Sequence, residues 1–393
     1  MALPEKKNPQ SAPAPASEAE ITTGGPPELE TGGVVTVDVA AIQSNYRALW
    51  ARVAPSECAA VVKADAYGCG IEPVVRALAK SACKTFFVAH LAEARIVRAL
   101  APEATVYALS GLPHGNAAGF AEAGVRPVIG STHELAEWDA FCTTSGWRGG
   151  AALHFDTGMN RLGIPVAEAA ALAQRIKAPD HGITLMMSHF ACSETPSHPL
   201  NNRQIQLFRE LRLMFRGIPA SLANSSGVFL GGLAHFDMVR PGYALYGGNP
   251  TPGATNPMHP VVDLKARIVQ VRTIARGETV GYGAAWTALR QARVAIISAG
   301  YADGYLRAAS GIEAKAGAEM LIGEARCRVI GRVSMDLLAV DVTAVAENVA
   351  RRGEWATLIG PGIDIDTLAA QCGTVGYELM CNLGRRYSRV WKR

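Results

Sequence analysis

The chain has 393 residues, 49% of them hydrophobic, which is enough for two domains, one of them of barrel size. Its 38 basic and 34 acidic residues leave a net charge of +4 spread along the chain, which excludes the basic surface of a nucleic-acid-binding protein. Eight scattered cysteines without a C-x-x-C pair exclude a zinc ribbon and indicate thiols in the reducing cytoplasm. No apolar run reaches the length of a membrane span, and no metal-binding motif is present, so neither a membrane nor a metal is expected.

The first 33 residues differ in composition from the rest. They are rich in proline, alanine, glutamate, glycine and threonine and lack the apolar stretch of a secretory signal. Such a segment cannot bury enough apolar surface to order itself. The sequence therefore predicts a flexible N-terminal tail over 1–33.

Residues 34–249 alternate short apolar runs with amphipathic segments. The apolar runs predict strands over 58–63, 85–90, 105–109, 126–130, 151–156, 183–189, 221–225 and 238–240. Apolar residues at i, i+3 and i+4 predict helices over 72–80, 91–100, 133–141, 166–177 and 202–215. This alternation predicts an α/β fold, an N-terminal (β/α)8 TIM-like barrel over 34–249.

After residue 249 the pattern changes. A proline-, glycine- and asparagine-rich loop over 250–260 is followed by β-branched runs separated by turn residues, at 265–274, 293–298, 325–330 and 337–342. Helical spacing returns only at 365–371. The sequence predicts a mostly β C-terminal domain over 250–393.

Reactive side chains stand at or just beyond the ends of the barrel strands. The carboxyl ends of such strands converge on one face of a barrel, where active sites form, and a hydrophobic core needs no polar groups there. These residues are Lys63, Asp156, His189, Asn224, Ser225 and Arg240.

Lys63 ends the apolar run at 59–63. A lysine that is partly removed from water has a lowered pKa and a nucleophilic amine, which suits a Schiff base with an aldehyde cofactor. On position alone, a lysine that merely extends to solvent from a strand end is the commoner case. The residues around Lys63 favour the first interpretation.

Eight segments in sequence order resemble the alanine racemases, a family of barrel-type (fold type III) pyridoxal-phosphate enzymes. Each motif alone is weak, but the ordered series is specific and covers the chain after the tail. The segments read VKADAYG at 62–68, DTGMNRLG at 156–163, SHFA at 188–191, NS at 224–225, RPG at 240–242 with YG at 246–247, VGYG at 280–283, GYADG at 300–304 and GRVSMD at 331–336.

The resemblance implies a pyridoxal 5′-phosphate site in the barrel. Lys63 would carry the cofactor, His189 would lie against its ring, and Arg240 would donate to its ring nitrogen. A guanidinium does not give up its proton, so it would leave that nitrogen unprotonated. The resemblance places the phosphate among Tyr67, Asn224, Ser225 and the backbone of Gly242 and Tyr243.

The position of a further phosphate contact stays open. Some members of the family place a tyrosine near the C-terminus that touches the phosphate and narrows the entrance. Counting without gaps from Tyr377, that position is Arg385 here, and Tyr387 follows two residues later. We assign Tyr387 to the cofactor site as the tyrosine at hand, with Arg385 as the alternative.

The resemblance also implies a second catalytic base and a homodimer with shared active sites. Racemisation needs an acid/base group on each face of the substrate Cα, and Tyr282 would arrive from the partner subunit. Arg161 and the Met335 backbone amide would bind the substrate carboxylate, and Tyr301 would line the entrance. Many members carry a carbamylated lysine where this chain has His154, so no carbamate is expected.

The expected activity is the racemisation of L-alanine to D-alanine, which supplies D-alanine for peptidoglycan. The alternatives are a broad-specificity amino-acid racemase and a decarboxylase of the same barrel class. Such decarboxylases carry a Cys-Asp segment in the β domain, where this chain has Met335 and Asp336. A non-catalytic carrier of the cofactor would lack the second domain that contains Tyr282.

Overall fold

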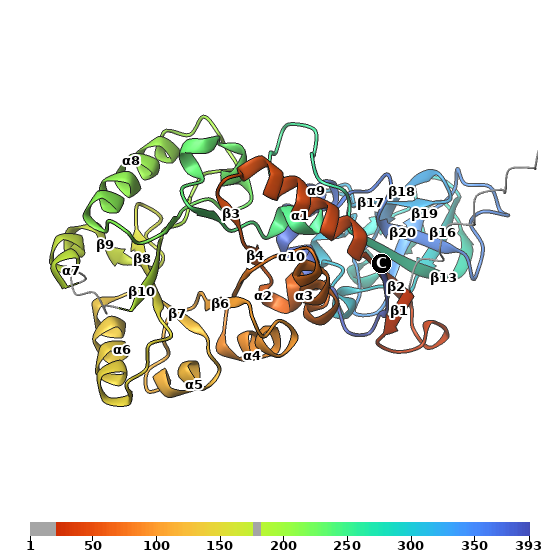
Figure 1. Cartoon of the computed structure of the whole chain (residues 1–393). Helices are drawn as coiled ribbons and strands as arrows, with labels where there is room; N and C mark the ends of the chain where they lie inside the picture. The colour runs from red at the N-terminus through yellow and green to blue at the C-terminus, as the bar shows by residue number, and fades with distance from the viewer. Residues whose placement is uncertain (1–20, 176–181) are drawn as a thin grey trace, which may run out of the picture.

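A ring of parallel strands surrounded by helices forms the first half of the molecule (Figure 1). The computed structural model describes residues 21–175 and 182–393. In ring order the strands are β4 (Ala60–Val61), β5 (Thr85–Val88), β6 (Thr105–Ala108), β7 (Arg126–Ile129), β8 (Ala151–Asp156), β10 (Ile183–Met187), β11 (Ala220–Ser221) and β12 (Met238–Val239).

The ring closes through the first strand. β12 pairs with β3 (Glu57–Cys58), which directly precedes β4, so one stretch of chain bonds to both ends of the sheet. β12 is only two residues long, which explains why the apolar run that predicted it, 238–240, is short. This closure confirms the predicted barrel.

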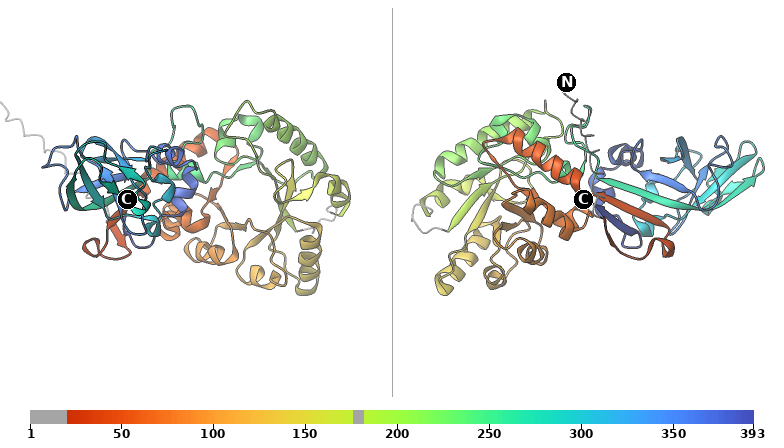
Figure 2. Two further views of the ribbon diagram at one scale, coloured as in Figure 1. Left: turned by 180° about the vertical axis from the view of Figure 1, so that it is seen from behind. Right: turned by 45° about the vertical axis from the view of Figure 1, so that its right-hand side comes forward.

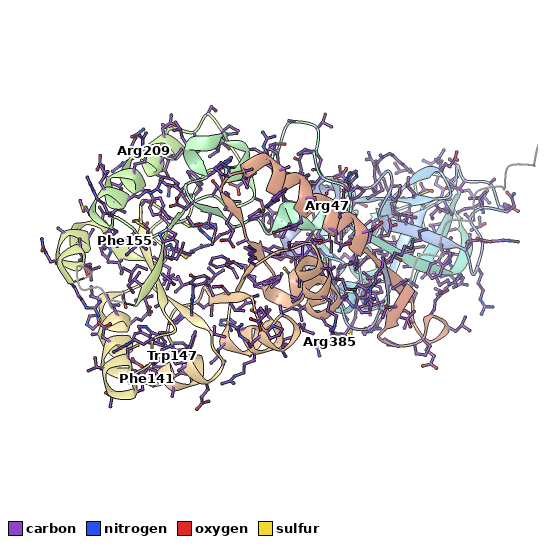
Figure 3. The ribbon with its side chains drawn as sticks, in the orientation of Figure 1. Arg47, Phe141, Trp147, Phe155, Arg209 and Arg385 are labelled. Atoms are coloured by element: carbon purple, nitrogen blue, oxygen red, sulfur yellow. The ribbon has the colours of Figure 1, made fainter. Side chains whose placement is uncertain are left out.

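Helices cover the outside of the ring, and side chains fill its interior (Figure 3). Phe155 on β8 packs against Phe215, the residue directly after α8, with ring centroids 5.1 Å apart. The helices are α1 (Val39–Val53), α3 (Ile71–Lys80), α4 (Leu91–Leu100), α5 (Ala117–Glu122), α6 (Thr132–Ser145), α7 (Ala169–Arg175) and α8 (Pro199–Met214).

The predicted helices agree with these bounds except at their ends. α8 begins three residues earlier than predicted because Pro199 suits a first helical turn and the His198 ring accepts the Leu200 N–H at 3.2 Å. The segment 166–168 is a 3-10 turn, and residues 176 and 177 of the predicted helix lie outside the described residues. Within 21–175 and 182–393, no helix combines the length and apolarity needed to cross a membrane.

The second half of the chain forms a mostly β domain beside the barrel (Figure 2). Its longest strand, β13 (Val262–Ile274), pairs with both β16 and β20, so the strands from β16 to β20 close on it. The other strands that the C-terminal half contributes to this sheet are β16 (Ala292–Ile297), β17 (Glu319–Ile322), β18 (Ala325–Ile330), β19 (Leu338–Asp341), β20 (Trp355–Ile359) and β21 (Ser388–Lys392). Together with the barrel, this confirms the predicted fold class.

The N-terminal boundary differs from the prediction. β1 (Ile21–Gly24) pairs with β21, and β2 (Gly33–Asp38) pairs with β13 and β21, so both belong to the C-terminal sheet. The predicted tail therefore includes ordered residues from 21 onward, and the barrel does not begin at 34. Residues 1–20 lie outside the described residues. A local pattern cannot tell which sheet a strand joins, because its partners lie more than 200 residues away.

Two helices near the C-terminus return the chain to the barrel. α9 (Ile365–Cys372) and α10 (Gly376–Cys381) pack together, and α10 packs against α2 (Lys63–Tyr67), the turn after β4 (Figure 1). The end of the chain therefore helps to wall the carboxyl face of the barrel.

Candidate active site

The predicted reactive residues meet at the carboxyl end of the barrel. Lys63 follows β4, Asp156 ends β8, and Arg240 follows β12. His189 and Ser225 follow β10 and β11 within a few residues. Parallel strands bring these ends to one face, as the sequence predicted.

Lys63 stands at the start of a left-handed turn. The residues from Ala64 to Tyr67 have φ between 53° and 55°, a region that non-glycine residues rarely occupy. The Glu93 carboxylate holds this turn: one oxygen accepts the Ala64 N–H at 2.7 Å, and the other accepts the Ala89 N–H at 2.8 Å. Strain of this kind persists where surrounding contacts fix it and is common at functional sites.

The Lys63 amine is poised as a nucleophile. Partial burial lowers its pKa, and the positive charge of Arg161 lowers it further, while Cys381 and Glu93 act in the opposite direction. A lysine with a lowered pKa is unprotonated more often at neutral pH and can attack a carbonyl carbon.

Arg240 is a buried cation without a counter-charge. It is 3% exposed, and no carboxylate among the described residues pairs with it. Its guanidinium donates to the Ser188 carbonyl at 2.6 Å and to Ser221 Oγ at 2.5 Å, and burial lowers its pKa to about 9. A buried charge without a counter-ion is unfavourable, and the oxygens of Ser188 and Ser221 offset part of that cost.

His189 lies beside Arg240, with Nδ1 3.4 Å from the guanidinium. Burial and then the charges of Arg240 and Arg161 hold its pKa well below the usual range, so its ring is neutral. Gln204 fixes this segment: its amide donates to the His189 carbonyl at 2.8 Å and accepts the Ala191 N–H at 3.0 Å. Sequence reasoning missed Gln204, since a glutamine within an amphipathic helix carries no distinguishing signal.

His154 and Asp156 lie at the end of β8, close to Arg161. Burial and the charge of Arg240 lower the pKa of His154 to about 4, so it is neutral. One Asp156 oxygen accepts the N–H groups of residues 158, 159 and 160 at 2.8, 2.9 and 3.2 Å. These bonds shape the loop that ends in Arg161, whose side chain is exposed.

Ser225 and Gly242 form one corner of the site. Ser225 Oγ accepts the N–H groups of Gly242 at 3.0 Å and Ala244 at 3.1 Å. A side chain at position 242 would lie 2.3 Å from Tyr67 Oη, so only glycine allows this approach. Asn224 Oδ1 accepts Ser193 Oγ and the Gly227 N–H, and thereby shapes the loop.

Tyr243 and Tyr377 extend this corner. Their rings stack with centroids 3.9 Å apart, and the ring of Tyr377 lies 6.2 Å from that of Tyr67. The Tyr243 hydroxyl donates to Asp366 at 2.7 Å. Tyr387 does not join them, since its buried ring packs against Gly33. Arg385 is exposed. The C-terminal tyrosine near this corner is Tyr377, the residue from which the position was counted, and not Tyr387.

Tyr282, Tyr301 and Met335 lie on an exposed face of the β domain. Their side chains are 72%, 44% and 53% exposed, and a cavity of 380 Å³ beside them is lined by Tyr282, Arg332 and neighbouring apolar residues. No contact or charge interaction among the described residues joins Tyr282 to Lys63. Within one chain the two predicted bases are therefore separate.

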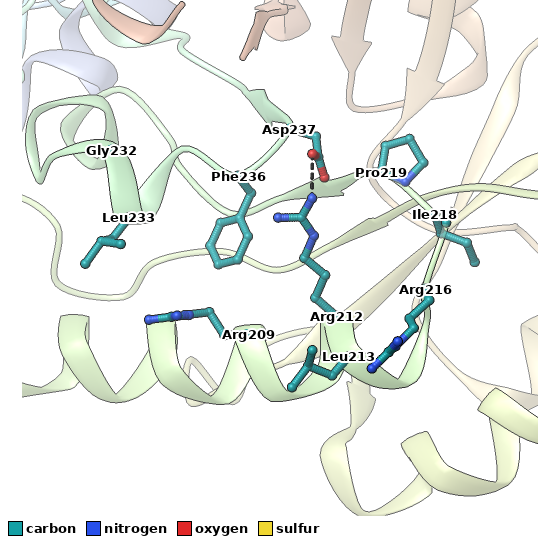
Figure 4. A pocket seen from close by; sticks show the side chains of 11 residues that line it. Arg209, Arg212, Leu213, Arg216, Ile218, Pro219, Gly232, Leu233, Phe236 and Asp237 are labelled. Atoms are coloured by element: carbon teal, nitrogen blue, oxygen red, sulfur yellow. Dashed lines mark hydrogen bonds and ion pairs between the residues drawn. The ribbon is translucent and has the colours of Figure 1, made fainter. Parts of the chain in front are cut away.

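A larger cavity, of 840 Å³, lies elsewhere, between α8 and the segment before β12 (Figure 4). It contains none of the predicted site residues. Arg212 crosses it to bind Asp237 at 2.6 Å, between Arg209 and Arg216. The size of a cavity therefore does not identify the candidate active site of this molecule. The cluster of reactive groups on the barrel face identifies it.

Two family descriptions cover almost all of the described chain. Alanine racemase, N-terminal domain, matches residues 37–250, and alanine racemase, C-terminal domain, matches residues 261–391. The chain belongs to the alanine racemase family. It is 50% identical over 360 residues to the alanine racemase of Methylobacterium sp. (strain 4-46), which covers 92% of this chain and 98% of that relative.

Solved structures of this family have the same fold. The alanine racemase from Bartonella henselae with covalently bound pyridoxal phosphate superposes with a TM-score of 0.87 at 35% identity, over 92% of this chain and 99% of that one. The biosynthetic alanine racemase from Pseudomonas aeruginosa gives a TM-score of 0.85 at 37% identity, over 92% and 100%. As a member of this family, the chain is an isomerase that works with pyridoxal phosphate.

Proposed function

We propose that this chain interconverts L- and D-alanine as a homodimer, with Lys63 of one subunit and Tyr282 of the other as the two bases. The proposal rests on the family and on the residues assembled at the barrel face. The observation that carries the shared site is the exposure of Tyr282, which makes no contact with Lys63 among the described residues.

The residues at the barrel face fit pyridoxal phosphate. Arg240 is a buried cation without a carboxylate partner, and its N–H groups would also donate to the ring nitrogen. Lys63 supplies the amine for the aldehyde carbon. Ser225, Tyr67 and the Gly242 segment would hold the phosphate at the corner where barrels of this type bind it. Bound there, pyridoxal phosphate withdraws electrons from the alanine Cα and acidifies its proton.

Lys63 and Tyr282 would move the Cα proton on opposite faces. A phenol has a pKa near 10 and accepts a proton at neutral pH only where positive groups assist it. His189 is neutral, so the positive groups on the barrel side that would assist include Arg161 and Arg240. The proton that one base removes is replaced by one that the other base delivers, which inverts the centre.

Met335 offers a free donor for the alanine carboxylate. Its N–H donates to no described residue, while its carbonyl accepts the Ala302 N–H at 3.0 Å. We assign the carboxylate to this N–H and to Arg161, whose planar fork matches two oxygens.

Subunit mixing tests the shared site. Lys63→Ala and Tyr282→Phe should each be inactive alone. If the site is shared, a mixed dimer has one intact site, so an equal mixture after subunit exchange should regain about a quarter of wild-type activity. Exchange itself is verified by native mass spectrometry.

The matched control mixes Lys63→Ala with Lys63→Met. Every site in that mixture lacks the lysine, so no activity should return. If exchanged dimers of the first mixture also remain inactive, both bases belong to one chain and the cross-subunit mechanism is wrong.

We further propose a biosynthetic role in the cytoplasm, the supply of D-alanine. Unpaired buried thiols such as Cys58, Cys69 and Cys83 fit a reducing compartment. Growth of a D-alanine-requiring bacterial strain carrying this chain, without added D-alanine, tests the role. Rates with a panel of L-amino acids decide between alanine and a broader substrate range.

A further inference from the structure

Three segments of the β domain interlock beside the predicted substrate entrance. Tyr301 N–H donates to the Ser334 carbonyl at 3.1 Å, and Ala302 N–H donates to the Met335 carbonyl at 3.0 Å. The third segment reaches them through Gly384, whose N–H donates to the Asp303 carbonyl at 3.0 Å. The residues that would meet the substrate, Tyr301 and Met335, thus lie on segments that touch each other and the C-terminal stretch.

One side chain ties all three segments together. Arg386 Nε lies 3.1 Å from Asp303 Oδ1, and its Nη1 donates to Asp336 Oδ1 at 2.8 Å. Asp303 is buried, and its other oxygen accepts the Gly300 N–H at 2.9 Å, so that carboxylate is fixed at the start of the 300–304 segment. Asp336 directly follows Met335. The guanidinium therefore connects a buried carboxylate to the turn that contains Met335.

This tie contributes little to the stability of the whole domain. Arg386 and Asp336 are 54% and 56% exposed, and exposed ion pairs are worth about 0–1 kcal/mol. Within the turn, the Ser334 N–H and hydroxyl both donate to the Leu337 carbonyl, and the Met335 and Ser334 carbonyls accept the N–H groups of Ala302 and Tyr301.

We propose that Arg386 is a positioning residue for substrate: by holding Asp303 and Asp336 at once, it fixes the turn that presents the Met335 N–H to the alanine carboxylate. The inference rests on the proposed function. A planar guanidinium can donate to two carboxylates at fixed angles, whereas a lysine ammonium is a single point charge at the end of a flexible side chain.

Kinetics of Arg386→Ala test the proposal. We expect KM for alanine to rise about tenfold, within the range of coupling between contacting residues, with kcat changed less than about twofold. The change in kcat/KM must be equal for L- and D-alanine, because the equilibrium constant between two enantiomers is one. Arg351→Ala, which breaks an exposed ion pair with Glu354 in the same domain, is the control and should leave KM unchanged.

Two further variants separate positioning from simple attraction of the carboxylate. If Arg386 acts by its charge, Arg386→Lys restores KM, and Asp336→Asn lowers KM by removing a negative charge. If it acts by position, Arg386→Lys does not restore KM, and Asp336→Asn raises it. The double variant Arg386→Ala with Asp336→Asn should then be no worse than Arg386→Ala alone.

A measurement that does not depend on catalytic activity tests this inference separately from the proposed function. Amide hydrogen exchange of the peptide over 333–337 should be about tenfold faster in Arg386→Ala than in the wild type or in Arg351→Ala. A wild-type protein that does not racemise alanine refutes the proposed function whatever the exchange shows. Unchanged exchange and KM in Arg386→Ala, or full rescue by Arg386→Lys, overturns the positioning role.

Discussion

Replacing Glu93 with glutamine should loosen the turn that carries Lys63. The four residues of that turn lie in the left-handed region, which costs about 1–2 kcal/mol for each non-glycine residue. The Glu93 carboxylate offsets part of this by accepting the Ala64 N–H with one oxygen and two N–H groups at the start of α4 with the other. Glutamine has one acceptor oxygen and therefore cannot serve both sides.

The expected loss follows from the bond that disappears. A hydrogen bond to a charged acceptor contributes about 1.5–3 kcal/mol, so we expect Glu93→Gln to unfold about 2 kcal/mol more easily. For a barrel-sized unit this lowers Tm by roughly 4–8 °C. Thermal unfolding followed by far-ultraviolet circular dichroism measures it, and fluorescence titration with pyridoxal phosphate should show weaker binding.

Two further variants show the direction and the size of this effect. Glu72→Gln removes an exposed carboxylate paired with Arg76 at 3.0 Å and should change stability by less than about 0.5 kcal/mol. Ala64→Gly relieves the left-handed penalty at an exposed position and should stabilise by up to about 1 kcal/mol. If Ala64→Gly destabilises the protein, or if Glu93→Gln has the same Tm as Glu72→Gln, the turn is neither strained nor held by Glu93.

Three other outcomes are expected. Borohydride reduction of the yellow holoenzyme should fix the cofactor to Lys63, and a peptide map with the label on another lysine contradicts the site. A chain beginning at Gly33 should melt below one beginning at Ile21, because it lacks β1 and the Glu28–Arg267 ion pair; equal melting temperatures contradict that role. Because the His154 pKa is lowered to about 4 in the folded state, the unfolded state binds its proton first as pH falls. The free energy of unfolding should therefore fall by up to roughly 3 kcal/mol between about pH 6.5 and 4 because of this group. In His154→Gln the fall should be smaller. If urea unfolding gives the same pH dependence for His154→Gln and the wild type, the assignment is contradicted.

The sequence by itself determined the barrel and the face that carries the chemistry. Apolar runs alternating with amphipathic segments identify parallel strands, and a polar residue at the end of each run must lie at the common carboxyl face. Lys63, His189 and Arg240 could be placed there from position alone. Their roles came from the ordered motifs, since residue type and spacing are what the family shares.

Tertiary structure decided what depends on partners far along the chain. It put β2 in the C-terminal sheet, connected Glu93 to the Lys63 turn and Gln204 to His189, and placed Tyr377 rather than Tyr387 near the corner formed by Ser225 and Gly242. Each of these residues has an ordinary local setting in the sequence. Their significance arises from strand register and helix packing, which bring together groups that a local pattern does not connect, because hydrogen bonds and ring contacts act through space rather than along the chain.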